Sequence, residues 1–444
     1  MKNLFLFIAT ALCTGSVSAQ ELSAKLEEYM QARVKQNKFN GVVLVAKDGK
    51  VLLHKGYGWR DAQKRIPHDE QSIFQIGSIT KQFTATIVLY LQERGKLNVQ
   101  DKLSKYIPDY PQGDKIAIHH LLTHTSGIFN YTNNSSFMNT EVTKPIAIEK
   151  LVDVFRDKPL DFEPGSKFSY SNSGYILLGY IIQKVSGKSY EQMVREVIFH
   201  PLQMQQSGFD FTALNSAGKS IGYLALNTDT VVSRIVDSSV SYAAGAIYST
   251  AGDLYKWHKG LYTEKTIKQS SFVQAYTPFK NKYGYGWGID TLNGKRVISH
   301  NGGIFGFVSD MWRVPADSAC IIILSNRPDE LNVITRNLFA IIYNQPYEIP
   351  RERKIIEVPE STLQQYVGEY ELSPTFKVSV TLENGKLRTQ ATNQQKIDLF
   401  AERENFFFMK VVNAQVEFLK NAEGKVDRLV IYQGGKEQTA RRIE

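Results

Sequence analysis

Hydrophobic side chains recur at helical spacing in two stretches of the first hundred residues. Between residues 21 and 36 they stand three or four positions apart, which predicts an amphipathic helix. The same spacing follows the segment FQIGS at 74–78 and predicts a second helix that ends near Gly95. The positions that define the two patterns are Leu22, Leu26, Tyr29, Met30 and Val34, then Ile79, Phe83, Ile87 and Leu91.

Strand patterns occur at two separated places in the chain. Residues 41–59 predict a β-hairpin around a turn at Asp48–Gly49, and strands return in 283–325, followed by a helical pattern near 331–343. Between them, residues 115–260 are mainly helical in spacing. We therefore expect an α+β fold in which one sheet is built from both parts of the chain, beside an inserted helical layer.

The chain predicts two domains. Residues 20–346 form the first, and the charged, proline-containing segment 347–360 is typical of a linker. From residue 361 to 444, alternating strands separated by Asn-Gly and Glu-Gly turns predict a small all-β, barrel-like domain.

The first nineteen residues have the organisation of a signal peptide. Lys2 precedes a short apolar stretch, and the small residues that end at Ala19 offer a cleavage site before Gln20. No second long apolar run follows, so no transmembrane helix is expected after signal removal. The sequence thus predicts a periplasmic or secreted protein.

Composition and charge remove several other function classes. With 42% hydrophobic and 22% charged residues in 444, the chain is typical of a globular protein. The net charge of +9 is spread among acidic residues, so nucleic-acid binding is not expected. Cys13 leaves with the signal, and Cys320 lies in an apolar run, which predicts a core thiol and no disulfide. No metal and no cofactor are expected.

Candidate chemistry begins with the motif S-x-x-K, which occurs twice. Ser78 and Lys81 open the predicted helix, where residues three apart are neighbours. A serine hydroxyl needs a base, and a desolvated lysine with a lowered pKa can serve. The helix start also provides N–H groups for an oxyanion. The second copy, Ser216 and Lys219, lies in a loop-like stretch and is set aside.

The motif Y-x-N also occurs twice. Tyr170 and Asn172 follow the turn Pro164–Gly165 and precede a predicted helix, a loop position suited to catalysis. A tyrosinate can act as a base when a cation stabilises it, and Asn172 can bind both a substrate and Lys81. The copy at 131–133 lies in an Asn-rich segment, where a surface turn is the preferred interpretation.

The motif H-x-G occurs at His54, His258 and His300. Only His300 is followed by Asn301-Gly302-Gly303 inside a strand pattern, and glycine there permits close approach of a ligand. The N–H of Gly303 is expected to join that of Ser78 in an oxyanion hole. A protonated His300 would attract an anionic group.

In their order, these three motifs resemble class C β-lactamases and relatives such as D-alanyl-D-alanine carboxypeptidases, D-aminopeptidases and β-lactamase-fold esterases. Four flanking segments also resemble the family, and the match covers about 40–345. They are LLTHTSGI at 121–128, EPGSKFSYSNSGYILLG at 163–179, AAGAIYSTAGDL at 243–254 and YGYGWGI at 283–289.

The resemblance implies a five-stranded antiparallel sheet flanked by helices, and an acyl-enzyme on Ser78. It implies that Lys81 and Tyr170 transfer protons and that the substrate meets Asn172 and the third motif. The residues expected at that motif are His300, Gly302 and Gly303. The C-terminal domain resembles lipocalin-like appendages of some members.

The third motif departs from the Lys-Thr-Gly of typical class C β-lactamases, which lowers the expectation of β-lactamase activity. A peptidase or esterase acting on small-molecule or peptide substrates is the first hypothesis. A class C-type β-lactamase, or a penicillin-binding sensor that acylates without turnover, remains open. The sequence gives neither the substrate nor the oligomeric state.

Overall fold

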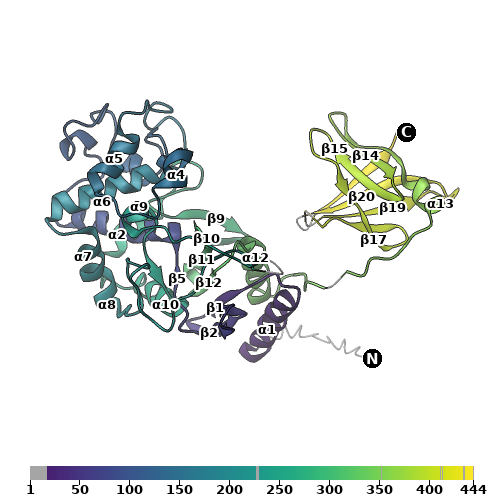
Figure 1. Cartoon of the computed structure of the whole chain (residues 1–444), viewed down its shortest axis with the longest axis horizontal. Helices are drawn as coiled ribbons and strands as arrows, with labels where there is room; N and C mark the ends of the chain where they lie inside the picture. The colour runs from purple at the N-terminus through teal and green to yellow at the C-terminus, as the bar shows by residue number, and fades with distance from the viewer. Residues whose placement is uncertain are drawn as a thin grey trace, which may run out of the picture. The chain divides into compact units, whose positions relative to one another are not determined.

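Six strands from distant parts of the chain form one antiparallel sheet in the computed structural model. Residues 18–226, 230–351, 353–410, 412, 414–433 and 436–443 are described. The strand order is β2 (Lys50–Tyr57), β1 (Gly41–Lys47), β12 (Ala319–Ser325), β11 (Phe307–Val314), β10 (Lys295–Ile304) and β9 (Gly288–Leu292) (Figure 1). The predicted α+β class and the joining of both chain parts are confirmed, with β9 as one strand more than expected.

The turn between β1 and β2 shows how local sequence sets this sheet. Asp48 and Gly49 both adopt positive φ, of 51° and 72°, which is the backbone of a type I′ hairpin turn. The hairpin pairs Gly41 with Tyr57 at its far end. The predicted hairpin is therefore confirmed, and its Asp-Gly pair is the reason for it.

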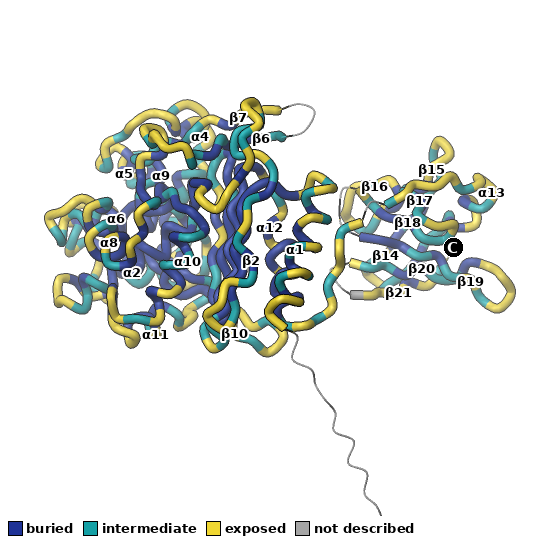
Figure 2. The backbone as a smooth tube through the Cα atoms, turned by 90° about the horizontal axis from the view of Figure 1, so that it is seen from below, coloured by how far each residue is buried: buried dark blue, intermediate teal, exposed yellow. Residues whose placement is uncertain are grey.

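Two helical layers bury the sheet on both faces. On one face lie α1 (Ala19–Lys35) and α12 (Leu331–Ile342), whose core includes Val43 and Val45 of β1. The other face receives the larger helical layer and the remaining β1 side chains. Because both faces are covered, β1 and β12 are buried and apolar at nearly every position. Figure 2 shows the buried centre of this unit in dark blue.

The larger layer holds most of the helices that surround the site. Its α-helices are α2 (Thr80–Glu93), α3 (Ile118–Leu122), α4 (Ser135–Thr140), α5 (Ile148–Arg156), α6 (Asn172–Ser186), α7 (Tyr190–Val194), α8 (His200–Leu202), α9 (Ser238–Gly245), α10 (Ala251–Gly260) and α11 (Gln269–Ala275). Five short helical turns join the elements of this first unit: η1 (Gly77–Ile79), η2 (Leu103–Lys105), η3 (Tyr131–Asn133), η4 (Arg195–Phe199) and η5 (Pro315–Asp317). Short two-stranded pairings tie its loops together: β3 (Trp59–Asp61) with β4 (Ile66–Pro67), β5 (Phe74–Gln75) with β8 (Tyr248–Ser249), and β6 (Tyr223–Ala225) with β7 (Val231–Val232).

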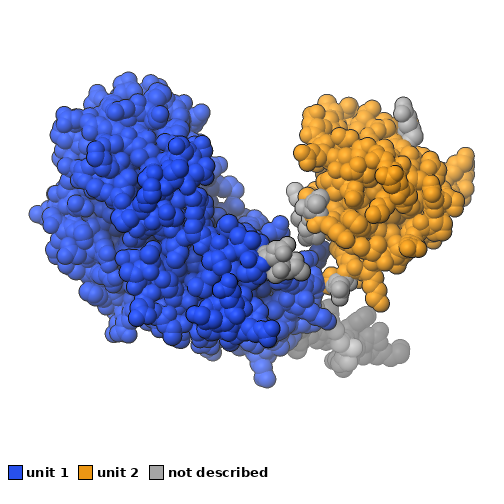
Figure 3. All heavy atoms as spheres, in the orientation of Figure 1, with its two compact units in different colours: residues 1–350 blue, residues 351–444 orange. Residues whose placement is uncertain are grey.

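The chain divides into two compact units, residues 1–350 and 351–444 (Figure 3). The second unit holds α13 (Glu360–Leu363), the turn η6 (Gln364–Tyr366) and one nine-stranded antiparallel sheet around a core of aliphatic and aromatic side chains. Its strands are β13 (Gly368–Ser373), β14 (Phe376–Glu383), β15 (Lys386–Ala391), β16 (Ile397–Asp398), β17 (Phe400–Arg403), β18 (Phe406–Phe408), β19 (Ala414–Lys420), β20 (Val426–Gln433) and β21 (Lys436–Arg442). The predicted C-terminal all-β domain is confirmed, while the boundaries at 346 and 361 stay a prediction.

The N-terminal prediction falls mostly outside the described residues, since these begin at Ser18 and the signal peptide was assigned to residues 1–19. Within the described ranges, no helix has both the length and the apolar character needed to cross a membrane. Cys320 is a buried free thiol whose pKa is raised by burial to about 12, as expected of a core residue.

Candidate active site

Ser78 stands at the junction of a short strand and the most buried helix of the fold. It lies in η1, between β5 and the first turn of α2, rather than in the helix itself. Gly77 before it has φ of 51°, a conformation that glycine adopts without steric cost. The tight turn leaves the Ser78 side chain half-buried while its neighbours Gly77 and Ile79 are buried.

Lys81 is fully buried, and its amine lies among three oxygen atoms. Nζ is 3.1 Å from Ser78 Oγ, 2.8 Å from Asn172 Oδ1 and 2.8 Å from the carbonyl oxygen of Ala244. Two of these atoms can only accept hydrogen bonds. A neutral amine therefore uses both N–H groups on Asn172 and Ala244, and its lone pair faces the Ser78 hydroxyl.

Burial lowers the pKa of Lys81 well below its ordinary value of 10.5. Desolvation disfavours the ammonium form, and no carboxylate among the described residues forms an ion pair with this amine to offset it. The sequence prediction that Lys81 neighbours Ser78 in a desolvated setting agrees with this geometry.

Tyr170 covers the Lys81 amine, which lies 4.9 Å from the centre of its ring. Burial raises the pKa of Tyr170 above its ordinary value of 10, and Ser78 acts weakly against that rise. The phenolic oxygen is buried without a hydrogen bond of ordinary geometry, so its contact with Ser78 is loose. The raised pKa favours the protonated phenol, and the role of Tyr170 in proton transfer stays a prediction.

Asn172 is the first residue of α6 and is held by a loop that sequence reasoning set aside. Its N–H donates to Asn130 Oδ1 at 3.0 Å, and its Nδ2 donates to Thr132 Oγ1 at 3.3 Å. Tyr131 is buried, and its hydroxyl donates to the Val240 carbonyl. The interpretation of 131–133 as a surface turn is therefore wrong, because this turn supports the site.

The carbonyl of Ala244 was not predicted as part of the site. It lies in α9, which is kinked at Tyr242, where φ is 37° and ψ is −130°. Two successive carbonyls consequently face α2: that of Ala243 accepts from Thr84 Oγ1 at 2.6 Å, and that of Ala244 accepts from Lys81. The only sequence signal was the family-like segment 243–254, whose first residues, Ala243 and Ala244, have side chains without functional groups.

His124 was also missed as a site residue, although it lies in the quoted segment LLTHTSGI. Its carbonyl accepts from Ser169 N–H at 2.9 Å and its Nδ1 accepts from Ser171 N–H at 3.2 Å. Its ring lies against that of Tyr170, with centroids 4.1 Å apart. The two backbone bonds on either side of Tyr170, together with the ring contact, fix that side chain.

The glycines of the third motif bring β10 against the turn that carries Ser78. A Cβ atom added to Gly302 would overlap the carbonyl oxygen of Ile76, and one added to Gly77 would lie 2.9 Å from the nitrogen of Gly303. At Gly303 the same addition meets no atom within 4 Å, so this position faces open space. The structure thus brings the backbones of η1 and Gly303 together, as an oxyanion hole requires.

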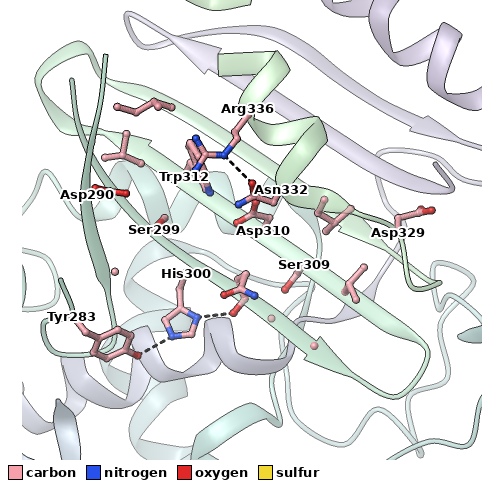
Figure 4. Close-up of a pocket in the computed structure, with 18 of the residues that line it drawn as sticks. Tyr283, Asp290, Ser299, His300, Ser309, Asp310, Trp312, Asp329, Asn332 and Arg336 are labelled. Carbon is pink, nitrogen blue, oxygen red and sulfur yellow. Dashed lines mark hydrogen bonds between the residues drawn. The ribbon is translucent and has the colours of Figure 1, made fainter. Parts of the chain in front are cut away.

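His300 is buried, and both of its ring nitrogens are occupied. Nε2 is 2.8 Å from the Tyr283 hydroxyl, and Nδ1 donates to the Asn301 carbonyl at 2.6 Å (Figure 4). Burial, with a smaller effect of Lys81, lowers the pKa of His300 to about 3. This arrangement favours the neutral imidazole, and the binding of substrate by His300 stays a prediction.

A cavity of about 620 Å³ follows the edge of β10. Its wall includes Tyr170, His300, Gly302 and Gly303, and it continues over β10 to polar side chains beside α12 (Figure 4). Ser78 and Lys81 are not part of this wall, but their neighbour Tyr170 is. Among the described residues, no cluster of His, Cys, Asp or Glu side chains could hold a metal ion.

The motif copies that the sequence analysis set aside are used elsewhere. Lys219 donates to the Thr212 carbonyl, away from Ser216. His54 faces Glu70 at 3.6 Å, and His258 accepts a hydrogen bond from Arg313. These contacts give each of them a structural partner.

An antiparallel sheet between helical layers, with a Ser-Lys pair beside its outer part, defines the β-lactamase/transpeptidase-like class of protein. Comparison with known families agrees. The chain belongs to the Beta-lactamase family, whose model matches residues 26–342. A second model, described as Domain of unknown function (DUF3471), matches residues 352–442.

Individual relatives support the same class. Penicillin-binding protein 4* of Bacillus subtilis (strain 168) is 29% identical over 447 residues, covering 94% of this chain and 98% of that protein. The octameric penicillin-binding protein homologue from Pyrococcus abyssi has 24% identity and a TM-score of 0.68, over 94% of this chain and 99% of that one. D-amino acid amidase from Ochrobactrum anthropi SV3 has 22% identity and a TM-score of 0.63, over 73% and 99%. Similarity to the last two structures shows only that this chain shares their fold.

Substituting the two neighbouring glycines of the third motif tests the packing of β10 against η1. Gly302→Ala is expected to lower the free energy of unfolding by about 1–3 kcal/mol, because its methyl group overlaps Ile76. Gly303→Ala is the matched control and should leave that free energy unchanged. Urea unfolding measures both, and equal stabilities of the two variants would contradict the close approach.

Proposed function

We propose that the protein is a serine hydrolase that forms an acyl-enzyme on Ser78 and acts on amide, peptide or ester substrates. The observation that carries the proposal is the buried Lys81 amine, 3.1 Å from Ser78 Oγ, with its other two contacts made to carbonyl oxygens. The predicted signal peptide supports action in the periplasm or outside the cell.

Acylation begins at the amine. Lys81 takes the proton of Ser78 as Oγ attacks the substrate carbonyl carbon, and the N–H groups of Ser78 and Gly303 receive the oxyanion. The Tyr170 phenol then donates its proton to the leaving amine or alcohol as the scissile bond breaks. The Lys81 ammonium returns a proton to Tyr170, and water completes the cycle by releasing the acyl group from Ser78. Asn172 orients both the substrate and Lys81.

His124 is the proposed positioning residue of this cycle, since it holds Tyr170 without facing the reacting atoms. The cavity along β10, with His300 and Gly302 in its wall, is the proposed substrate-binding region.

A second candidate function is supported by one observation. The relative that matches nearly the whole chain is named as a penicillin-binding protein, which favours a protein that is acylated by penicillin, either as a class C-type β-lactamase or as a sensor without turnover. Labelled penicillin that stays on Ser78 after excess reagent is removed would support the sensor.

Ser78→Ala is expected to lower kcat for a p-nitrophenyl ester at least about 10⁴-fold, because Ser78 has the only hydroxyl among the described residues that is hydrogen-bonded to the Lys81 amine. Mass spectrometry after fluorophosphonate treatment should place the label on Ser78. The matched control is Ser216→Ala, which alters the other S-x-x-K copy and should retain the full rate. A label on Ser216, or an unchanged rate for Ser78→Ala, would contradict the proposal.

The pH profile of kcat/KM follows from the two shifted pKa values. Lys81 must be unprotonated to act as a base, and its lowered pKa places the acid limb well below pH 10.5. Tyr170 must keep its proton, and its raised pKa places the alkaline limb above pH 10. Neutral His300 should add no limb between pH 5 and 8. A rate that still rises through pH 10.5 would exclude Lys81 as the base.

His124→Leu is expected to lower kcat roughly 10- to 100-fold with little change in KM, because it releases the segment that holds Tyr170. His124→Asn should recover part of the loss. Its amide oxygen can accept from Ser171, and asparagine tolerates the positive φ of 56° at this position. Equal kcat values for both variants would show that the bond to Ser171 does not position Tyr170.

A further inference from the structure

A chain of hydrogen bonds links two buried imidazoles through the hydroxyl of Tyr283. Ser171 N–H meets His124 Nδ1 at 3.2 Å, and His124 Nε2 is 3.3 Å from the Tyr283 oxygen. That hydroxyl is 2.8 Å from His300 Nε2, while His300 Nδ1 is 2.6 Å from the Asn301 carbonyl. Every buried nitrogen of the two rings therefore has a partner.

The two ends of this chain fix the proton positions on the ring nitrogens that they contact, His124 Nδ1 and His300 Nδ1. A backbone N–H can only donate, so His124 Nδ1 accepts and His124 Nε2 carries the proton that Tyr283 receives. The Tyr283 hydroxyl, which also interacts with Tyr175, completes the pattern when it donates its proton to His300 Nε2. A backbone carbonyl can only accept, so the proton of His300 lies on Nδ1 and points to Asn301. The complete pattern is satisfied with both imidazoles neutral.

The charged and titratable groups around His300 also favour the neutral ring. A protonated Lys81 of α2 would act against a positive charge on both imidazoles, and His300 acts against a charge on His124. The Tyr170 ring, 6.3 Å from the His300 ring, belongs to a phenol that keeps its proton. No described carboxylate forms an ion pair with His300.

Two arginines on other elements, Arg234 and Arg336, have partners outside the third motif. Arg234 donates to the carbonyls of Met138 and Asn139 and lies over the ring of Phe305, beyond the end of β10. In the cavity wall, Arg336 donates to Asn332 Oδ1 and lies over Trp312. Neither guanidinium forms a described bond to the third motif. The third motif therefore offers hydrogen bonds but no positive charge of its own.

We propose that this chain keeps His300 as a neutral imidazole and that the site consequently prefers acyl substrates without a carboxylate next to the scissile bond, namely uncharged amides and esters. The inference rests on the proposed acyl-enzyme function and specifies its substrate class. A carboxylate bound here would lose its water of hydration without gaining an ion pair, which disfavours it.

Two thioesters that differ in one group test the proposal. N-benzoyl-D-alanyl thioglycolate carries a carboxylate beyond the scissile bond, and the corresponding thioglycolamide carries a neutral carboxamide. The full chain should release thiol from the carboxamide with a kcat/KM at least roughly 10-fold higher at pH 7.5. Equal values, or a preference for the carboxylate, would overturn the proposal.

Variants locate the origin of the preference. His300→Lys should lower the carboxamide-to-carboxylate ratio of kcat/KM at least roughly 10-fold, because it adds a cation to the third motif. Tyr283→Phe should lower it less, since it removes one hydrogen bond and keeps the ring. Arg234→Gln is the control and should leave the ratio unchanged; a changed ratio in this variant would assign the preference to Arg234 and overturn the role of His300.

The outcomes also separate this proposal from the function on which it rests. If neither thioester releases thiol while a fluorophosphonate still labels Ser78, the substrate class is wrong and the reactive serine stands. If Ser78 is not labelled, the acyl-enzyme function fails, and the substrate class fails with it.

Discussion

The burial of the Lys81 amine among three oxygen atoms is the interaction on which the rest of the site depends. A lysine without exposed surface and without a carboxylate partner is stable mainly as a free amine, because desolvation penalises the charge. Each surrounding element contributes to this state. The turn before α2 presents Ser78, the start of α6 presents Asn172, and the kinked α9 presents the carbonyl of Ala244.

Backbone geometry around the amine is as specific as the side chains. Tyr242 adopts a sparsely populated conformation, and the two carbonyls that follow it face Thr84 and Lys81. Gly302 lets β10 approach the carbonyl of Ile76, where any side chain would collide. The reactive geometry thus depends on packing between segments that are more than 150 residues apart in the chain.

The sequence predicted the elements well and the environment of the site less well. Period and turn residues identify the helix after Ser78 and the hairpin at Asp48–Gly49, because those signals are local. Motif order selected Tyr170 and Asn172, and the fold brings them to Lys81. The shifts in the pKa of Tyr170 and of His300 were not predictable, because burial by remote segments causes them. The hydrogen bond from Lys81 to the Ala244 carbonyl was also not predictable, since every residue has a backbone carbonyl.

The neutrality of Lys81 and that of His300 are coupled. Each is a potential cation in a buried region, and the field of Lys81 lowers the pKa of His300. The same electrostatic coupling acts in the other direction, because the interaction between two charges is mutual. A permanently protonated residue at position 300 would oppose protonation of Lys81 during acylation. The third motif therefore influences both which substrate charge the site accepts and how strong a base Lys81 is. A neutral imidazole at position 300 leaves Lys81 free to accept the Ser78 proton.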